Sequence, residues 1–329
     1  MIGHEPLERL AGVLAATVGV MQQGIMEADA SRYKGVDGSA PIDWSDPKVN
    51  TRAVREYLDA LDPAPNPDRK TPKVISLFDP CSAWTAKANK RVRFGYGLNY
   101  LIDNAHAVIV DVEATPARSY DEVAATKTMI QRTQERLRLK PERIAGDTAY
   151  GTGRLLGWLV EQNIAPHIPV WDKSKRDDGT LSRADFRFDK EDDVYICPTG
   201  KRLETTGKVH DGKTLLYRAS KLDCDRCPLK PTCCPNTPSR KIPRDLHEDA
   251  RDHARSLIGT EPYERSRRER KKVEMLFAHL KRHLGFERLR LRGLSGARDE
   301  FLLAATVQNL RRLAKLVGRP PPTAVACTA

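Results

Sequence analysis

A run of alternating apolar residues between Val92 and Ile102 places the tightest constraint on the fold of this chain. Apolar side chains at every second position are typical of a β-strand with one buried face. A polar turn at 103–105 leads into a second, more continuously apolar strand, expected from Ala107 to Val112. The two segments predict a β-hairpin around which the other elements of the domain must pack.

Helix and strand signals alternate after this hairpin. Ser119 and Glu122 have the spacing of a capping box, which predicts a helix that begins here. A short strand at 143–146 should deliver Asp147 at its end, Thr152 should cap the next helix, and 165–170 should return as a strand. This order predicts a mixed α/β fold.

The rest of the chain differs in character. Residues 32–91 are rich in Pro, Asp and Gly, which predicts irregular structure with one short helix near 49–61, and two more helices are expected at 266–284 and 297–317. We therefore expect five regions, which are an atypical N-terminal segment (1–24), the first part of a core (25–170), a basic Cys-rich insertion (171–262), helices that complete the core (263–317) and a disordered tail (318–329).

The charge of the chain points to a polyanionic partner. Lysine and arginine outnumber aspartate and glutamate by 56 to 44, a formal net charge of +12. The longest apolar stretch, 10–21, is shorter than the roughly 20 residues of a membrane span. Its acidic flank also argues against an export signal. We expect a cytoplasmic, nucleoid-associated protein without a membrane partner.

One predicted helix concentrates that charge. Residues 265–292 hold eleven basic and three acidic side chains, a net charge of +8. Val273, Leu276, Phe277, Leu280 and Leu284 form one apolar stripe, whereas Arg267, Arg270, Glu274 and Lys281 share a polar face beside it. An ordinary solvated face with weak ion pairs is one interpretation. The excess of cations favours binding to DNA phosphates instead.

Several motifs together resemble one family. They are Arg270, Glu274 and Lys281 with gaps of three and six residues, the segment GDTAYG at 146–151, EADAS at 27–31, CPTGK at 197–201, CDRCP at 224–228 and QNL at 308–310. This set resembles insertion-sequence transposases of the DDE type over about Ile25 to Leu316.

The resemblance implies an RNase H-like mixed sheet flanked by helices, with the Cys-containing insertion before the last catalytic helix. It implies that Asp147 and Glu274 hold two Mg²⁺ or Mn²⁺ ions. Carboxylate oxygens are the hard ligands that these ions prefer. Ions bound in this way promote in-line cleavage of phosphodiesters. Double-stranded DNA would be the partner of a homo-oligomer, with phosphate contacts from Arg267, Arg270, Lys271 and Lys281.

The family's third carboxylate is missing. Its place lies on the first strand, seven residues before Asp29, and this register falls on Gln22. Glutamine is neutral and a poor Mg²⁺ ligand. Asp29 is the nearest acidic substitute, but an odd offset on a strand places it on the opposite face. Because 1–24 does not resemble the family, we expect a truncated or rearranged copy with impaired catalysis.

A cysteine cluster is the second candidate site. Cys224 and Cys227 form a CxxC pair, and Cys197 and Cys233, or Cys234 in its place, could complete a tetrahedral structural Zn²⁺ site. Reduced, partly buried thiols are the alternative.

Three functions follow from these features. The first is a DNA transposase that cleaves DNA and transfers strands. The second is a catalytically inactive, transposase-derived DNA-binding protein. The third is a zinc-ribbon scaffold that binds RNA or a partner protein.

Overall fold

The computed structural model describes residues 18–61, 72–86, 91–171, 176 and 178–317, and it divides the chain into two compact units. Unit 1 comprises Met1–Ala149, Asn163–Ile168 and Ile258–Ala329, and unit 2 comprises Tyr150–Gln162 and Pro169–Leu257. The expected tail at 318–329 lies outside the described residues. No helix within the described ranges is long and apolar enough to cross a membrane.

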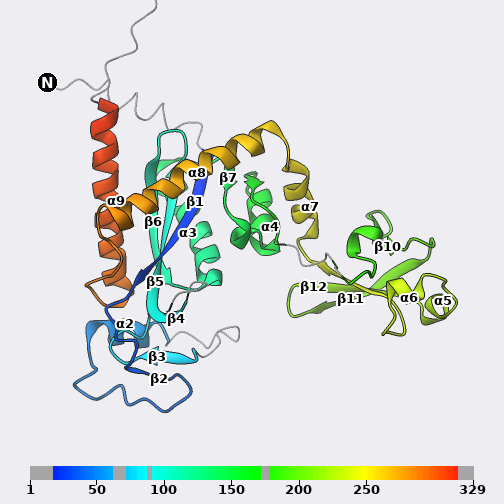
Figure 1. The fold of residues 1–329 in the computed structure, drawn as a ribbon, viewed down its shortest axis with the longest axis horizontal. Coiled ribbons are helices and arrows are strands. Elements are labelled where there is room, and N and C mark those ends of the chain that lie inside the picture. Colours follow the sequence, from blue (N-terminus) through cyan, green and yellow to red (C-terminus); the bar gives the residue numbers. More distant parts are fainter. Residues whose placement is uncertain (1–17, 62–71, 87–90, 172–175, 177, 318–329) are drawn as a thin grey trace, which may run out of the picture. The chain divides into compact units, whose positions relative to one another are not determined.

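Unit 1 is built on a mixed, six-stranded sheet (Figure 1). Its order is β4-β5-β1-β7-β8, and β6 also pairs with β5. Strand β1 is antiparallel to β5 and parallel to β7, and β7 is parallel to β8. The strands are β1 (Val18–Glu27), β4 (Ala83–Thr85), β5 (Arg93–Asp103), β6 (Val108–Pro116), β7 (Arg143–Ala145) and β8 (Ala165–His167).

The predicted hairpin is confirmed as β5 and β6, with one correction. Strand β5 is buried at ten consecutive positions, from Phe94 to Asp103, rather than on one face only. Helices cover both faces of the sheet, so the alternating polar positions are also withdrawn from solvent. The mixed α/β class predicted from the element order is confirmed.

Helices α8 (Glu261–Arg282) and α9 (Gly293–Val317) cover one face. Val273, Phe277 and Phe301 lie in one apolar core with alternate residues of β1, β5 and β6. Helix α3 (Ser119–Leu137) covers the other face, where Arg132 binds Asp111 at 2.8 Å and Glu113 at 2.6 Å on β6.

The N-terminal boundary expected at 24 falls inside β1, because this strand begins at Val18. Strand β1 lies between β5 and β7, so 18–24 belongs to the sheet. A smaller, two-stranded sheet follows in sequence. It consists of β2 (Gly35–Asp37) and β3 (Val74–Ser76), with α2 (Arg52–Asp59) between them in the chain.

Unit 2 contains the Cys-rich segment. Its antiparallel sheet has the order β13-β12-β11-β10-β9 and encloses a core that includes Phe186, Tyr195, Tyr217 and Cys233. Thr152 caps α4 as predicted, because its hydroxyl oxygen accepts a hydrogen bond from the Leu155 amide. The other elements are β9 (Arg187–Asp189), β10 (Val194–Ile196), β11 (Arg202–His210), β12 (Thr214–Ala219), β13 (Lys241–Asp245), α4 (Gly153–Glu161), α5 (Lys221–Asp225), α6 (Lys230–Cys233) and α7 (Glu248–Leu257).

Candidate functional site

Asp147 lies two residues beyond the end of β7, at the surface of unit 1. Its Oδ1 accepts a hydrogen bond of 2.9 Å from the amide of Ala149 and so fixes the turn after the strand. The side chain is exposed. The carboxylate therefore keeps free lone pairs for another ligand.

The parallel register places Asp147 beside the middle of β1. The last pair of the β1–β7 ladder is Val20 with Ala145. Asp147 follows this pair by two residues, just beyond the end of β7. Val20 and Met26, on the same strand, are buried in the core beneath α8 and α9.

Helix α8 crosses this part of the sheet, because it contacts β8, β7 and β1. Near its start, the Ser266 hydroxyl lies 2.8 Å from Nδ1 of His167 at the end of β8. Near its end, Nζ of Lys281 donates a hydrogen bond of 3.1 Å to the carbonyl oxygen of Ile25 in β1. The residues between these two contacts therefore pass over β7 and β1.

Glu274 lies within that stretch, one helical turn before Phe277. The Phe277 ring contacts the backbone position of Gly24 in β1, two residues from position 22. The Glu274 side chain is half exposed, and it forms an ion pair with Arg270, whose Nη2 lies 3.7 Å from Oε1. A long ion pair of this kind leaves the carboxylate available.

The predicted apolar stripe of this helix is confirmed, because Val273, Phe277 and Leu280 are buried against the sheet. The polar face beside it has three different environments. Arg267 pairs with Glu264 at 2.7 Å, Lys271 is exposed to solvent, and Lys281 binds the β1 backbone. Arg267 and Lys271 are thus the more accessible cations of the predicted DNA-binding set.

Asp29 occupies a different part of the sheet. It follows the end of β1, seven residues beyond position 22, which corresponds to about 23 Å at the usual rise of a strand. Arg288 binds its Oδ1 at 2.9 Å, and Arg292 binds its Oδ2 at 3.0 Å. The structure therefore separates Asp29 from Asp147 and gives it two structural arginine partners.

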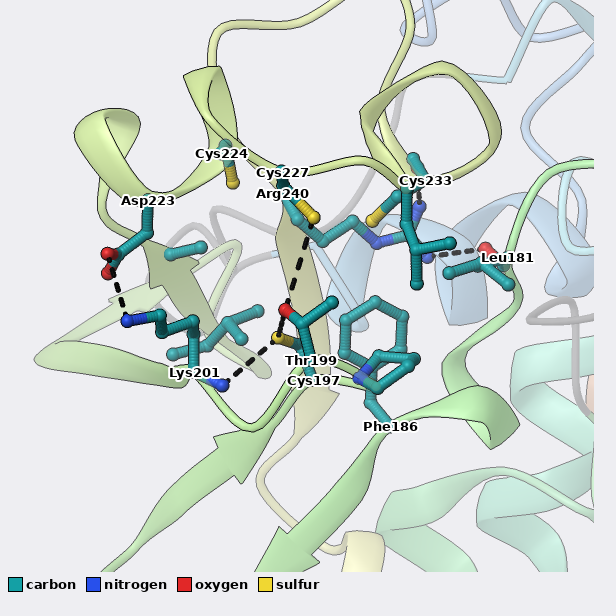
Figure 2. Close-up of a pocket in the computed structure, with 14 residues that line it drawn as sticks. Leu181, Phe186, Cys197, Thr199, Lys201, Asp223, Cys224, Cys227, Cys233 and Arg240 are labelled. Atoms are coloured by element: carbon teal, nitrogen blue, oxygen red, sulfur yellow. Dashed lines mark hydrogen bonds and ion pairs between the residues drawn. The ribbon is translucent and has the colours of Figure 1, made fainter.

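The cysteines predicted to bind zinc line one small cavity in unit 2 (Figure 2). The Thr199 hydroxyl lies 3.1 Å from the Cys197 Sγ and 4.0 Å from the Cys227 Sγ. The amide of Lys201 donates to the Cys197 Sγ at 3.3 Å. Sequence spacing therefore identified four thiols that the fold brings to one cavity: Cys197, Cys224, Cys227 and Cys233.

Neighbouring thiols affect two of these cysteines, Cys224 and Cys233. Burial, followed by the neighbouring Cys234, raises the pKa of Cys233 to about 11. Burial also raises the pKa of Cys224. Within the described part of the chain, no three His, Cys, Asp or Glu side chains converge closely enough to hold a metal ion. The arrangement does not support the zinc interpretation.

Two exposed carboxylates, Asp147 and Glu274, thus remain as oxygen donors of the type that Mg²⁺ and Mn²⁺ prefer. Residues 196–314 match the family described as transposase DDE domain. The chain is therefore similar to that family over this segment. The match includes Glu274 and Lys281 and confirms the resemblance to an insertion-sequence transposase. No curated protein and no solved structure matches the chain.

Proposed function

We propose that the chain acts on double-stranded DNA as a DDE transposase, with Asp147 and Glu274 as its two metal-binding carboxylates. The single observation that carries the proposal is the route of α8, which crosses from β8 to β1 and brings position 274 over the strand that lies beside Asp147. The strand order β6-β5-β1-β7-β8 supports an RNase H-like core. Its antiparallel part lies on one side of β1 and its parallel part on the other.

Each residue of the site has a definable part in phosphodiester cleavage. Divalent ions, when bound, would activate the attacking oxygen and stabilise the leaving oxygen. Asp147 and Glu274 would hold the ions through exposed carboxylate oxygens. Arg267 and Lys271 would bind phosphates of the DNA backbone, because both side chains are exposed on the same helix as Glu274. Assembly as a homo-oligomer on transposon ends remains a prediction.

Position 22 weakens this site. It follows Val20, which pairs with Ala145 of β7, by two residues. The family resemblance places a carboxylate at this position, and the chain carries a neutral amide instead. An amide offers one uncharged oxygen, so the affinity for divalent cations falls. This observation favours a second candidate function, namely a DNA-binding protein that is derived from a transposase and does not cleave.

The decisive experiment restores the missing carboxylate. We expect Gln22→Asp to increase Mn²⁺-dependent nicking of supercoiled plasmid by about tenfold or more, because a third anionic oxygen strengthens metal binding. Asp147→Ala and Glu274→Ala, each made in the Gln22→Asp background, should abolish the nicking. Glu142→Ala is the matched control, since this exposed acid lies one residue before β7.

The possible outcomes separate the candidate functions. Nicking that requires both carboxylates and survives Glu142→Ala supports the enzyme. If the folded Gln22→Asp variant binds DNA but never cleaves it with Mg²⁺ or Mn²⁺, the transposase proposal is wrong and the inactive DNA-binding protein is favoured. If no variant binds DNA, only the scaffold function predicted from the sequence remains.

A further inference from the structure

A second cavity lies in unit 1, between α8, α9 and the turn that joins β5 to β6. Its volume is about 340 Å³, within the range of small-molecule sites. Val273 and Leu276 form an apolar wall from α8, and Ala105 and Ala107 add to it from the turn. The remaining lining is polar or cationic, which distinguishes this cavity from an ordinary packing defect.

The cavity is lined by four basic side chains: His279, Arg311, Arg312 and Lys315. Arg311 and Lys315 are exposed one helical turn apart on α9. Arg312 instead donates to the carbonyl oxygen of His106 at 2.5 Å. Burial, followed by the charges of Arg311, His283 and Lys315, lowers the pKa of His279. The rim therefore attracts an anion.

Two buried amide side chains also line the cavity, each with one unsatisfied oxygen. Asn104 and Gln308 are each 5% exposed, and Asn104 Oδ1 and Gln308 Oε1 have no hydrogen-bond partner. Their nitrogens are committed, because Asn104 Nδ2 donates to Glu269 at 2.8 Å and Gln308 Nε2 donates to the Leu276 carbonyl at 2.9 Å. Rotation of either amide would lose that bond, so both oxygens remain fixed as acceptors.

This cavity is separate from the flank of α8 that carries Glu274. Leu276 and His279 lie on one side of the buried stripe, and Glu274 and Lys281 lie on the other, at the usual periodicity of about 3.6 residues per turn. A ligand in the cavity therefore meets residues that the proposed metal site does not use.

We propose that this cavity receives one nucleotide of a DNA strand, whose phosphate contacts Arg311 and Lys315 and whose base donates an exocyclic amino group to Asn104 and Gln308. The proposal rests on the function proposed above, because it assumes that DNA is the partner. Cytosine has such an amino donor, whereas thymine presents a carbonyl acceptor at the corresponding position. Two fixed amide oxygens therefore favour cytosine over thymine.

The test measures binding without cleavage. Fluorescence anisotropy in EDTA compares labelled oligo-dC and oligo-dT strands of about 12 nucleotides. We expect the full chain to bind oligo-dC about fivefold or more tightly, since a well-placed base contact discriminates by roughly 1–3 kcal/mol. The double variant Arg311→Glu/Lys315→Glu should weaken binding of both strands by about tenfold or more.

Two further variants keep the result interpretable. Arg298→Glu reverses an exposed charge elsewhere on α9, away from the cavity, and should change either affinity less than about twofold. Gln308→Met should remove the preference for oligo-dC and leave the affinity for oligo-dT unchanged, with thermal unfolding as the check on folding.

Equal affinity for the two strands, or an equal loss with Arg298→Glu, would overturn the proposal. Failure to bind either strand would overturn it as well. None of these results would decide the Mn²⁺-dependent nicking of duplex DNA, so the two proposals can fail independently.

Discussion

Phe277 on α8 lies directly against Gly24 in β1, so closely that a methyl group at Gly24 would come within 2.7 Å of the Phe277 Cδ1. The ring is also 5.0 Å from that of Tyr100, centroid to centroid, and is 7% exposed. It therefore has little room to move. The absence of a side chain at position 24 is what lets this helix approach the strand that lies beside Asp147.

We predict that Gly24→Ala lowers the free energy of unfolding by about 1–3 kcal/mol, because the added methyl group overpacks a buried contact. Urea denaturation measures the loss. Combining Gly24→Ala with Phe277→Leu should cost less than the sum of the two single changes, since the smaller side chain relieves the clash. Additive losses would show that the two residues do not restrain each other.

His167 should make unfolding sensitive to acid. Burial, followed by the charge of Arg143, lowers the pKa of His167 to about 4 from an ordinary value of 6.5. The unfolded chain therefore binds the proton more readily. The neutral His167 side chain therefore contributes to the stability of the folded chain above about pH 6.5. This contribution is lost as the pH falls toward 4, by up to about 3 kcal/mol.

Denaturation across this pH range tests the prediction. His167→Gln should flatten the dependence of the unfolding free energy between pH 4 and 6.5. If the variant loses stability with acid as steeply as the wild type does, His167 is not the group responsible.

Asp79 should affect the pH dependence of stability in the direction opposite to His167. Its side chain is buried between Tyr96, whose hydroxyl donates to Oδ1, and the amide of Gly293, 3.2 Å away. Burial raises the pKa of Asp79 to about 6 from 3.8. The folded chain then binds the proton more tightly, so this residue lowers stability as the pH rises from about 4 to 6.

Asp79→Asn keeps an oxygen for both donors and removes the charge. We expect the variant to be more stable than the wild type at pH 8, by about 2 kcal/mol, and equally stable near pH 4. Calorimetry at the two pH values measures the difference. A variant that is less stable at pH 8 would show that the carboxylate is needed in its ionised form.

The exposed cations of α8 should be visible in the salt dependence of DNA binding. Arg267→Ala and Lys271→Ala should each weaken binding and reduce the slope of log affinity against log salt by about 1, because each removes one phosphate contact. Lys140→Ala is the control, since it removes an exposed charge outside α8. An unchanged slope in both α8 variants would exclude this helix from the DNA interface.

Sequence reasoning succeeded where the signal was local. The alternation at 92–102 and the stripe through Val273, Phe277 and Leu280 each predicted an element that the structure contains. It was less successful where pairing between distant segments decides the outcome. Asn104 and Gln308 are 204 residues apart and meet in one cavity only because α9 packs beside the hairpin, and neither the turn at 103–105 nor the QNL motif at 308–310 predicts that the two residues meet.

The cysteine cavity of unit 2 allows a last prediction, on thiol reactivity. Only the thiolate is nucleophilic, and burial raises the pKa of Cys233 to about 11, so very little of it is ionised at pH 8. We expect iodoacetamide to modify Cys233 far more slowly than Cys197, which is partly exposed and has a threonine hydroxyl 3.1 Å from its sulfur. Peptide mapping by mass spectrometry gives both rates.

Equal rates would contradict the burial argument. Joint protection of Cys197, Cys224 and Cys227 by added Zn²⁺ would restore the metal site that the sequence predicted, because only a shared ligand slows all three together.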